Sequence, residues 1–154
     1  GTEPTPGSRL GGVWEQAYKG HARVVRVLLE HGASVHACRA DGLTPLCQAS
    51  KAGHVLVVDM LLRAGAEVEA AGTQYGTTSL LMASKSGHAD VVRRLLAARA
   101  NTEVAGRAYG TTSLIASASL GHDRVVQLLL ASGGLPPPPS TSLYLPLPPS
   151  TSLY

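Results

Sequence analysis

The chain has 154 residues, of which 44% are hydrophobic but only 4% are aromatic, and it contains no Phe. This length suits one compact domain, and the composition excludes a core of large aromatic side chains in favour of Leu, Val and Ala. The formal net charge is only +3, and because no basic stripe with stacking aromatics occurs, we expect no nucleic-acid partner.

The cysteine count and the hydropathy pattern bear on the compartment. Cys38 and Cys47 are the two cysteines of the chain, whereas a small secreted domain that depends on disulfides normally carries more. The sequence has no apolar run of about 18 residues, so we expect no membrane span. The first residues lack the apolar core of a signal peptide. These features predict free thiols and an intracellular protein, either cytoplasmic or nuclear.

From residue 11 onward, one sequence pattern occurs four times, after a polar segment 1–10 that is predicted to be a flexible lead-in. The copies are GGVWEQAYKGHARVVRVLL (11–29), DGLTPLCQASKAGHVLVVDMLL (41–62), YGTTSLLMASKSGHADVVRRLL (75–96) and YGTTSLIASASLGHDRVVQLLL (109–130). Their Gly-His pairs follow one another at intervals of 33, 34 and 34 residues. A period of this size is typical of proteins built from stacked repeats.

The first repeat, predicted over 11–37, departs most from the pattern. Gly11-Gly12 replaces the Thr-Pro pair that begins a helix elsewhere. An atypical, more polar repeat is expected at the end of a stack, where one face has no neighbour, so we interpret it as an N-terminal cap. The side chains predicted to face the core from its second helix, about 23–30, are Val24, Val25, Leu28 and Leu29.

The second repeat, predicted over 38–71, has the clearest helix signals. Thr44 can cap a helix that has Pro45 at its first position, where the missing N–H costs nothing. In the following helix, Asp59 and Arg63 stand four residues apart, a spacing that predicts a pair supporting the helix.

The third and fourth repeats, predicted over 72–105 and 106–134, are nearly identical to each other. Both keep a capping threonine, Thr78 or Thr112, but have Ser in place of Pro after it. The loop before each holds one residue more than the loop before the second repeat. This similarity indicates either a recent duplication or deliberate design, and the sequence leaves both open.

The second repeat carries a family resemblance at many positions in register. They are Gly42-Leu43-Thr44-Pro45-Leu46, Ala49, Gly53-His54, Val57-Val58, Leu61-Leu62 and Gly65-Ala66. This pattern resembles the ankyrin repeat, and the resemblance covers about residues 11–134. It implies an all-α repeat solenoid of about four helix-turn-helix repeats with hairpin-like loops, and a concave face that binds other proteins. The chain departs from the family where a His is usual: Trp14, Cys47, Leu81 and Ile115 fill that position, which predicts apolar packing there.

Composition changes sharply after the repeats. Residues 135–154 read LPPPPSTSLY and LPLPPSTSLY, an uncharged tandem decapeptide for which polyproline II is the natural conformation. One hypothesis is that this tail docks on an ankyrin surface, its own or a neighbour's. A second is that Ser152-Leu153-Tyr154 is a ligand for a PDZ-like domain. A third is that the tail is a linker or tag.

No pattern in the sequence predicts catalysis, a cofactor or a metal. The four Gly-His histidines lie on different repeats, and neighbouring helices pack about 8–10 Å apart, so they cannot share one zinc ion with ligands at about 2 Å. We interpret them as structural residues of the inter-helix turns. His31 and His36 share a loop with Cys38, but no CxxC or HExxH accompanies them. Ser50, Ser84 and Ser117 occupy small-residue positions and form no acid–base pair.

The interaction hypothesis rests on the loop tips and the exposed side of each first helix. The predicted partner-binding residues are Trp14, Tyr18, Asp41, Leu43, Lys51, Gln74, Tyr75, Thr77, Lys85, Arg107, Tyr109, Thr111 and Leu120, with Lys19, Ala52, Ser86 and Ser119 adjoining. The tyrosines are of the amphipathic type that anchors interfaces. The sequence therefore predicts a non-enzymatic module that binds a protein or peptide, with a proline-rich peptide such as its own tail as one candidate ligand. The alternative is an engineered or structural scaffold whose tandem C-terminal peptide is a fused ligand, tag or linker. Partner identity and oligomeric state stay open.

Overall fold

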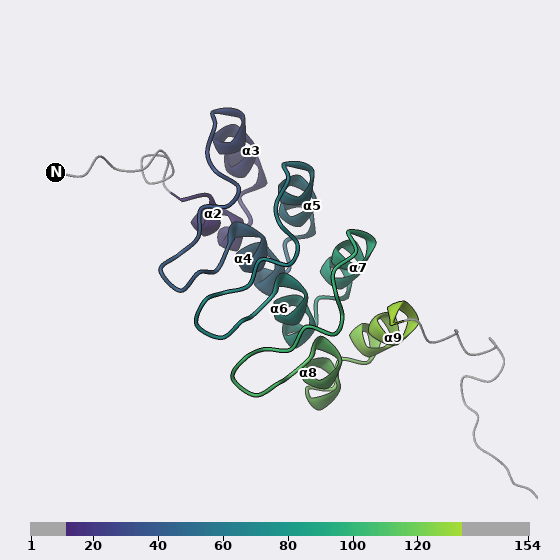
Figure 1. Cartoon of the computed structure of the whole chain (residues 1–154). Coiled ribbons are helices and arrows are strands. Elements are labelled where there is room, and N and C mark those ends of the chain that lie inside the picture. Colours follow the sequence, from purple (N-terminus) through teal and green to yellow (C-terminus); the bar gives the residue numbers. More distant parts are fainter. Residues whose placement is uncertain (1–11, 134–154) are drawn as a thin grey trace, which may run out of the picture.

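The computed structural model describes residues 12–133 and is shown in Figure 1. The predicted lead-in and the proline-rich tail lie outside these residues, as do the hypotheses attached to the tail. The described part contains eight helices in four consecutive pairs, and no strand is assigned within it. The helices are α2 Val13–Lys19, α3 Ala22–Glu30, α4 Pro45–Ala52, α5 Val55–Arg63, α6 Ser79–Ser86, α7 Ala89–Ala97, α8 Ser113–Ser119 and α9 Asp123–Ser132.

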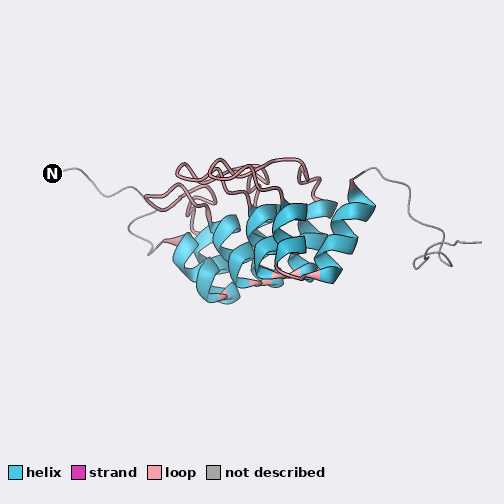
Figure 2. Ribbon diagram, turned by 90° about the horizontal axis from the view of Figure 1, so that it is seen from below, coloured by secondary structure: helices cyan, strands magenta, loops and turns pink. Residues whose placement is uncertain are grey.

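We call the pairs repeats 1 to 4, from α2–α3 to α8–α9. The first helices of the repeats, α2, α4, α6 and α8, pack side by side in one row, and the second helices, α3, α5, α7 and α9, form another row. The long loops between repeats all project to the same side of the helices (Figure 2). This arrangement confirms the predicted all-α repeat solenoid.

The core between the two rows is built from aliphatic side chains. Leu46, Leu61, Leu80 and Leu95 are completely or almost completely buried, together with valines from every repeat. One core prediction is wrong: Val24 is 45% exposed. The reason is that α3 is the first helix of its row among the described residues, so the side on which Val24 lies has no helix packed against it there.

The threonine caps are formed as predicted. The side-chain oxygens of Thr44, Thr78 and Thr112 each accept a hydrogen bond from the backbone N–H three residues on, at distances of 3.2, 3.2 and 3.3 Å. Each satisfies one of the backbone donors that the first turn of a helix leaves free. In α2, by contrast, Gly12 stands before the helix and supplies no side-chain cap.

The Gly-His pairs hold consecutive repeats together. The Nε2 atoms of His54, His88 and His122 lie 3.0, 3.0 and 3.1 Å from the backbone carbonyl oxygens of Tyr18, Lys51 and Lys85, one repeat earlier in each case. Because a carbonyl oxygen can only accept, each Nε2–H is the donor. This contact agrees with the structural role interpreted from the sequence, but it joins two consecutive repeats instead of closing a turn within one.

The same imidazole rings explain why the preceding residue of the pair is glycine. Gly20, Gly53 and Gly87 have φ values of 77°, 84° and 78°, a left-handed conformation that costs little only without a Cβ atom. A Cβ atom on any of them would come within 2.5 to 2.7 Å of the histidine ring of the next repeat. Each glycine therefore both ends a first helix and makes room for the neighbouring histidine. We call this series of contacts the Gly-His ladder.

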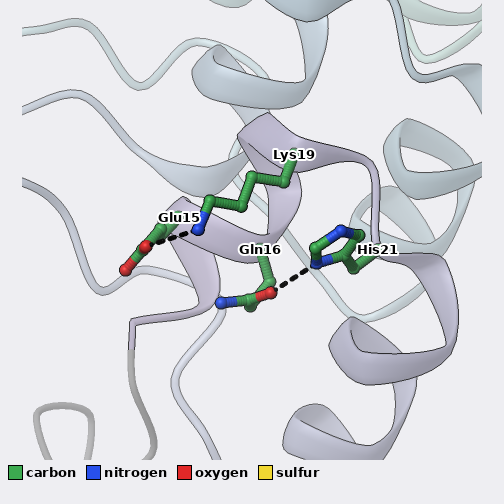
Figure 3. A network of polar contacts seen from close by, with 4 residues as sticks. All are labelled: Glu15, Gln16, Lys19 and His21. Carbon is green, nitrogen blue, oxygen red and sulfur yellow. Dashed lines mark hydrogen bonds and ion pairs between the residues drawn. The ribbon is translucent and has the colours of Figure 1, made fainter.

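Repeat 1 shows what replaces the ladder where no described repeat precedes it. The Nδ1 atom of His21 lies 2.8 Å from Oε1 of Gln16, and the ammonium group of Lys19 lies 2.9 Å from the carboxylate of Glu15 (Figure 3). Both contacts are internal to repeat 1. The interpretation of repeat 1 as an N-terminal cap stays a prediction.

One ion-pair prediction is wrong. Asp59 does not pair with Arg63; its carboxylate lies 2.9 Å from the guanidinium of Arg94, on the neighbouring helix of the row. The pair therefore joins α5 to α7. An acidic side chain on a helix can pair either with a basic residue four positions away or with one on the adjacent repeat. For Asp59, the adjacent repeat provides the partner.

Candidate functional site

The loops between repeats form a continuous wall beside the first helices. Backbone hydrogen bonds close each loop from Arg39 to Leu43 (3.1 Å), from Gly72 to Thr77 (3.1 Å) and from Gly106 to Thr111 (3.0 Å). The additional residue of the two later loops lies inside this closure. Consecutive loops are joined by the N–H of Thr73 donating to the carbonyl of Asp41 (3.1 Å) and the N–H of Arg107 donating to the carbonyl of Tyr75 (2.8 Å).

A groove of about 870 Å³ lies between this wall and the first helices of repeats 2 to 4. Its lining comes from the C-terminal end of α4, most of one face of α6, the loops before α6 and α8, and α8 itself. The lining residues are Lys51, Tyr75, Thr77, Leu81, Met82, Lys85, Ser86, Gly106, Ala108, Tyr109, Thr111, Ala116, Ser119 and Leu120.

The groove combines an apolar floor with prominent aromatic side chains. Leu81 is buried and Met82 half-buried, whereas Tyr75 is 54% and Tyr109 91% exposed. The two tyrosines stand at equivalent places in consecutive loops. Aromatic side chains beside an apolar floor are the composition expected of a protein-binding surface.

The structure brings seven of the thirteen predicted binding residues into this groove. They are Lys51, Tyr75, Thr77, Lys85, Tyr109, Thr111 and Leu120. Gln74 and Arg107 are exposed in the loops outside the lining, and Tyr18 is exposed at the end of α2, one repeat before Lys51. Their role in binding stays a prediction.

The remaining three predicted residues make contacts within the protein. The ring of Trp14 lies 5.4 Å from the guanidinium carbon of Arg39, a cation–π distance. Asp41 lies 3.7 Å from the same guanidinium, and its Oδ1 atom accepts the N–H of Leu43 at 3.1 Å. Leu43 itself lies against Gly72 of the next loop, where a Cβ atom would come within 2.9 Å of it. These contacts support the loop wall.

The sequence prediction missed the floor of the groove. Leu81, Met82, Ala108 and Ala116 were not among the predicted binding residues, although they line the groove beside predicted ones. Helical spacing could have found two of them, because Leu81 and Met82 precede Lys85 by four and three residues and so share its face of α6.

The unusual residues at the family's histidine position behave in two ways. Cys47 and Leu81 are buried, and the hydroxyl of Ser79 approaches the Cys47 sulfur at 3.3 Å. Ile115 is exposed instead, since no loop of a later repeat covers it among the described residues. The apolar packing predicted here is therefore found at Cys47 and Leu81, while Trp14 is half-buried and Ile115 is exposed. Both cysteines are free thiols, Cys38 exposed and Cys47 buried.

A smaller concavity of about 390 Å³ lies at the opposite ends of the helices. It is lined by the Gly-His pairs of repeats 3 and 4 and by the first turns of α7 and α9. Within residues 12–133, no group of three or more His, Cys, Asp or Glu side chains is arranged to hold a metal ion. Residues of the Gly-His ladder thus line this concavity.

Comparison with known proteins identifies the class. The family described as Ankyrin repeats (3 copies) matches residues 14–71 and 69–136, so the chain belongs to the ankyrin repeat family. Members of this family generally mediate protein–protein interaction and are typically not enzymes. No helix in the described part of the chain is long and apolar enough to span a membrane.

One curated relative is the Ankyrin repeat and KH domain-containing protein mask-1 of Caenorhabditis elegans. It is 36% identical over 58 residues, which make up 38% of this chain and 2% of that protein. The match thus concerns a small part of a much longer protein.

Proposed function

We propose that this chain is a binding module whose groove holds an extended segment of a partner protein. The observation that supports this most is the alignment of Tyr75 and Tyr109 above a shared apolar floor across repeats 2 to 4. A groove of this form runs across several repeats, so a partner segment lying along it contacts each repeat in turn. No catalytic group is needed for this role.

The two tyrosines are the proposed anchors. Each offers a large aromatic surface with a hydroxyl group and loses only a few rotamers on binding, which is why tyrosine is enriched among residues that dominate binding energy. Their backbones are also fixed in advance, because the carbonyl of Tyr75 accepts a hydrogen bond from the next loop and both loops are closed by backbone bonds. Little entropy is then lost when a partner orders them.

The test uses peptides selected from a displayed random library on the full chain. Replacing both tyrosines, Tyr75→Ala with Tyr109→Ala, should weaken binding of the selected peptides by more than ~2 kcal/mol, about 30-fold. Leu56→Ala is the matched control, because Leu56 is 61% exposed on α5, in the other helix row, and lies outside the groove. Unchanged affinity in the double variant would place the binding site elsewhere.

A scaffold role remains the second candidate, and the near-identical sequences of repeats 3 and 4 favour it. In that case the proline-rich segment is a fused ligand, tag or linker. A synthetic peptide with the sequence of residues 135–154 separates these possibilities. If the segment is a ligand of the groove, this peptide should compete with the library-selected peptides for the full chain. If it is a linker or tag, it should not.

A further inference from the structure

All charged side chains that line the groove are positive. Lys51 and Lys85 occupy equivalent positions at the ends of α4 and α6, 34 residues apart, and both line the groove. Neither takes part in an ion pair within residues 12–133, and none of the residues lining the groove is acidic. By contrast, Lys19 of repeat 1 is paired with Glu15. The groove therefore offers two lysine ammonium groups without a counter-charge from the described residues.

The Gly-His ladder fixes where these two charges start. The backbone carbonyls of Lys51 and Lys85 are the acceptors for His88 and His122. The Cα atom of each lysine is thus tied to the following repeat, so the separation of the two lysines is set by the stacking of the repeats. Only the flexible side chain has to be ordered when a ligand pairs with it.

The other end of the groove is apolar. The position equivalent to the two lysines in repeat 4 is Ser119, and next to it Leu120 is exposed. The exposed ring of Tyr109 belongs to the same end of the groove. The two lysines therefore lie over repeats 2 and 3, whereas the end of the groove over repeat 4 has exposed apolar and aromatic side chains and no lysine.

We propose that the partner segment is an extended acidic peptide that carries an apolar or aromatic residue at one end. This inference rests on the proposed function of the groove. Neighbouring helices pack about 8–10 Å apart, and a peptide in the extended polyproline II conformation advances about 3.1 Å per residue with about three residues per turn, so side chains three positions apart lie on the same face and are separated by about one repeat. The fitting pattern is an acidic residue, a second acidic residue about three positions on, and a large apolar residue about three positions further, read in either direction.

This chemistry disfavours one occupant in particular. Residues 135–154 of the chain contain no Asp or Glu, so they offer the lysines no counter-charge. The acidic peptide is instead a segment of another protein.

The experiment measures binding of fluorescent synthetic peptides to the full chain by anisotropy. The first peptide has Glu, Glu and Leu at the stated spacing on a neutral polar background, and the second has Lys in place of both Glu residues. We expect the acidic peptide to bind about tenfold more tightly, from two exposed ion pairs. The advantage should shrink as salt is added, because these charges lie at the surface.

Two sets of variants test whether the lysines cause the preference. Lys51→Glu with Lys85→Glu should reverse it in favour of the basic peptide, and Lys51→Gln with Lys85→Gln should abolish it. Arg63→Glu with Arg124→Glu is the control, because it changes the net charge equally through exposed residues of α5 and α9 that do not line the groove. Circular dichroism checks that each variant is folded.

The outcomes separate this inference from the proposed function. If both peptides bind equally and the double tyrosine variant weakens both, the groove binds peptides but the acidic preference is wrong. If the tyrosine variant weakens neither, the proposed function itself is wrong. Two further ligands are an acidic peptide with Ala in place of Leu and an RNA oligonucleotide. If either binds as tightly as the first peptide, and if this binding disappears in the lysine variants, the groove is a general polyanion-binding surface. That result also overturns the inference.

Discussion

Replacing Gly53 by Ala tests the Gly-His ladder most directly. Gly53 has φ 84°, and a non-glycine residue in this left-handed conformation costs roughly 1–2 kcal/mol. The added Cβ atom would also lie 2.6 Å from ring atoms of His88, so the ring must move. Moving it disturbs the 3.0 Å hydrogen bond to the carbonyl of Lys51, a contact of about 0.5–1.5 kcal/mol. We therefore expect Gly53→Ala to lower the free energy of unfolding by about 1.5–3.5 kcal/mol.

Gly121 provides the matched control for this substitution. It has a similar φ of 77°, but nothing within 4 Å would meet an added Cβ atom. Gly121→Ala should therefore cost only the backbone term of roughly 1–2 kcal/mol. The measurement is urea unfolding followed by far-ultraviolet circular dichroism.

A double-mutant cycle assigns the difference to the histidine ring. In a His88→Ala background the ring is absent, so Gly53→Ala should then cost no more than Gly121→Ala does. Residues in contact show such non-additive effects, whereas independent sites add within about 0.5 kcal/mol. An additive cycle, or equal costs for the two glycines, would refute the ladder as a source of stability between repeats.

Two further predictions concern the interior and one inter-repeat ion pair. Leu95 is completely buried, so Leu95→Ala should lower the free energy of unfolding by ~2–5 kcal/mol. Lys85→Ala, at an exposed position, should lower it by less than about 0.5 kcal/mol. Comparable losses of the two variants in urea unfolding would contradict the packing of α7. The pair of Asp59 and Arg94 is partly exposed and should show a coupling energy of about 0.2–1 kcal/mol in a double-mutant cycle. That coupling should weaken at high salt, and zero coupling at low salt would show that the 2.9 Å contact contributes nothing.

Local sequence signals predicted the features that depend on neighbours along the chain. Thr44 next to Pro45, and the threonines at the same place in later repeats, specify a helix start through a cap that spans only three residues. The 34-residue period specifies the solenoid, because each repeat must bury the same apolar positions against the next. These signals were sufficient for the fold.

Contacts between repeats were not predictable in the same way. The sequence predicted that Asp59 pairs with Arg63 of its own helix. The packing of α5 against α7 places Arg94 beside Asp59 instead. Val24 carries the same apolar signal as its buried equivalents, and its exposure follows from its position at the end of the described row. For the same reason, the floor of the groove emerged only once the loops were placed beside α6 and α8.

The Gly-His ladder restricts how such a chain can change its length. Each contact joins a glycine of one repeat to the histidine of the next, with the same two residue types on every internal boundary. Deleting or duplicating a whole repeat therefore places an existing glycine against an existing histidine and leaves no side chain without its partner. An insertion or deletion of a few residues inside a helix pair would move the histidine away from its glycine. The loops absorb such changes, because the loop before repeat 3 already holds one residue more than the loop before repeat 2. Viable length variants of this protein should accordingly differ by multiples of about 33 residues, or in the loops alone.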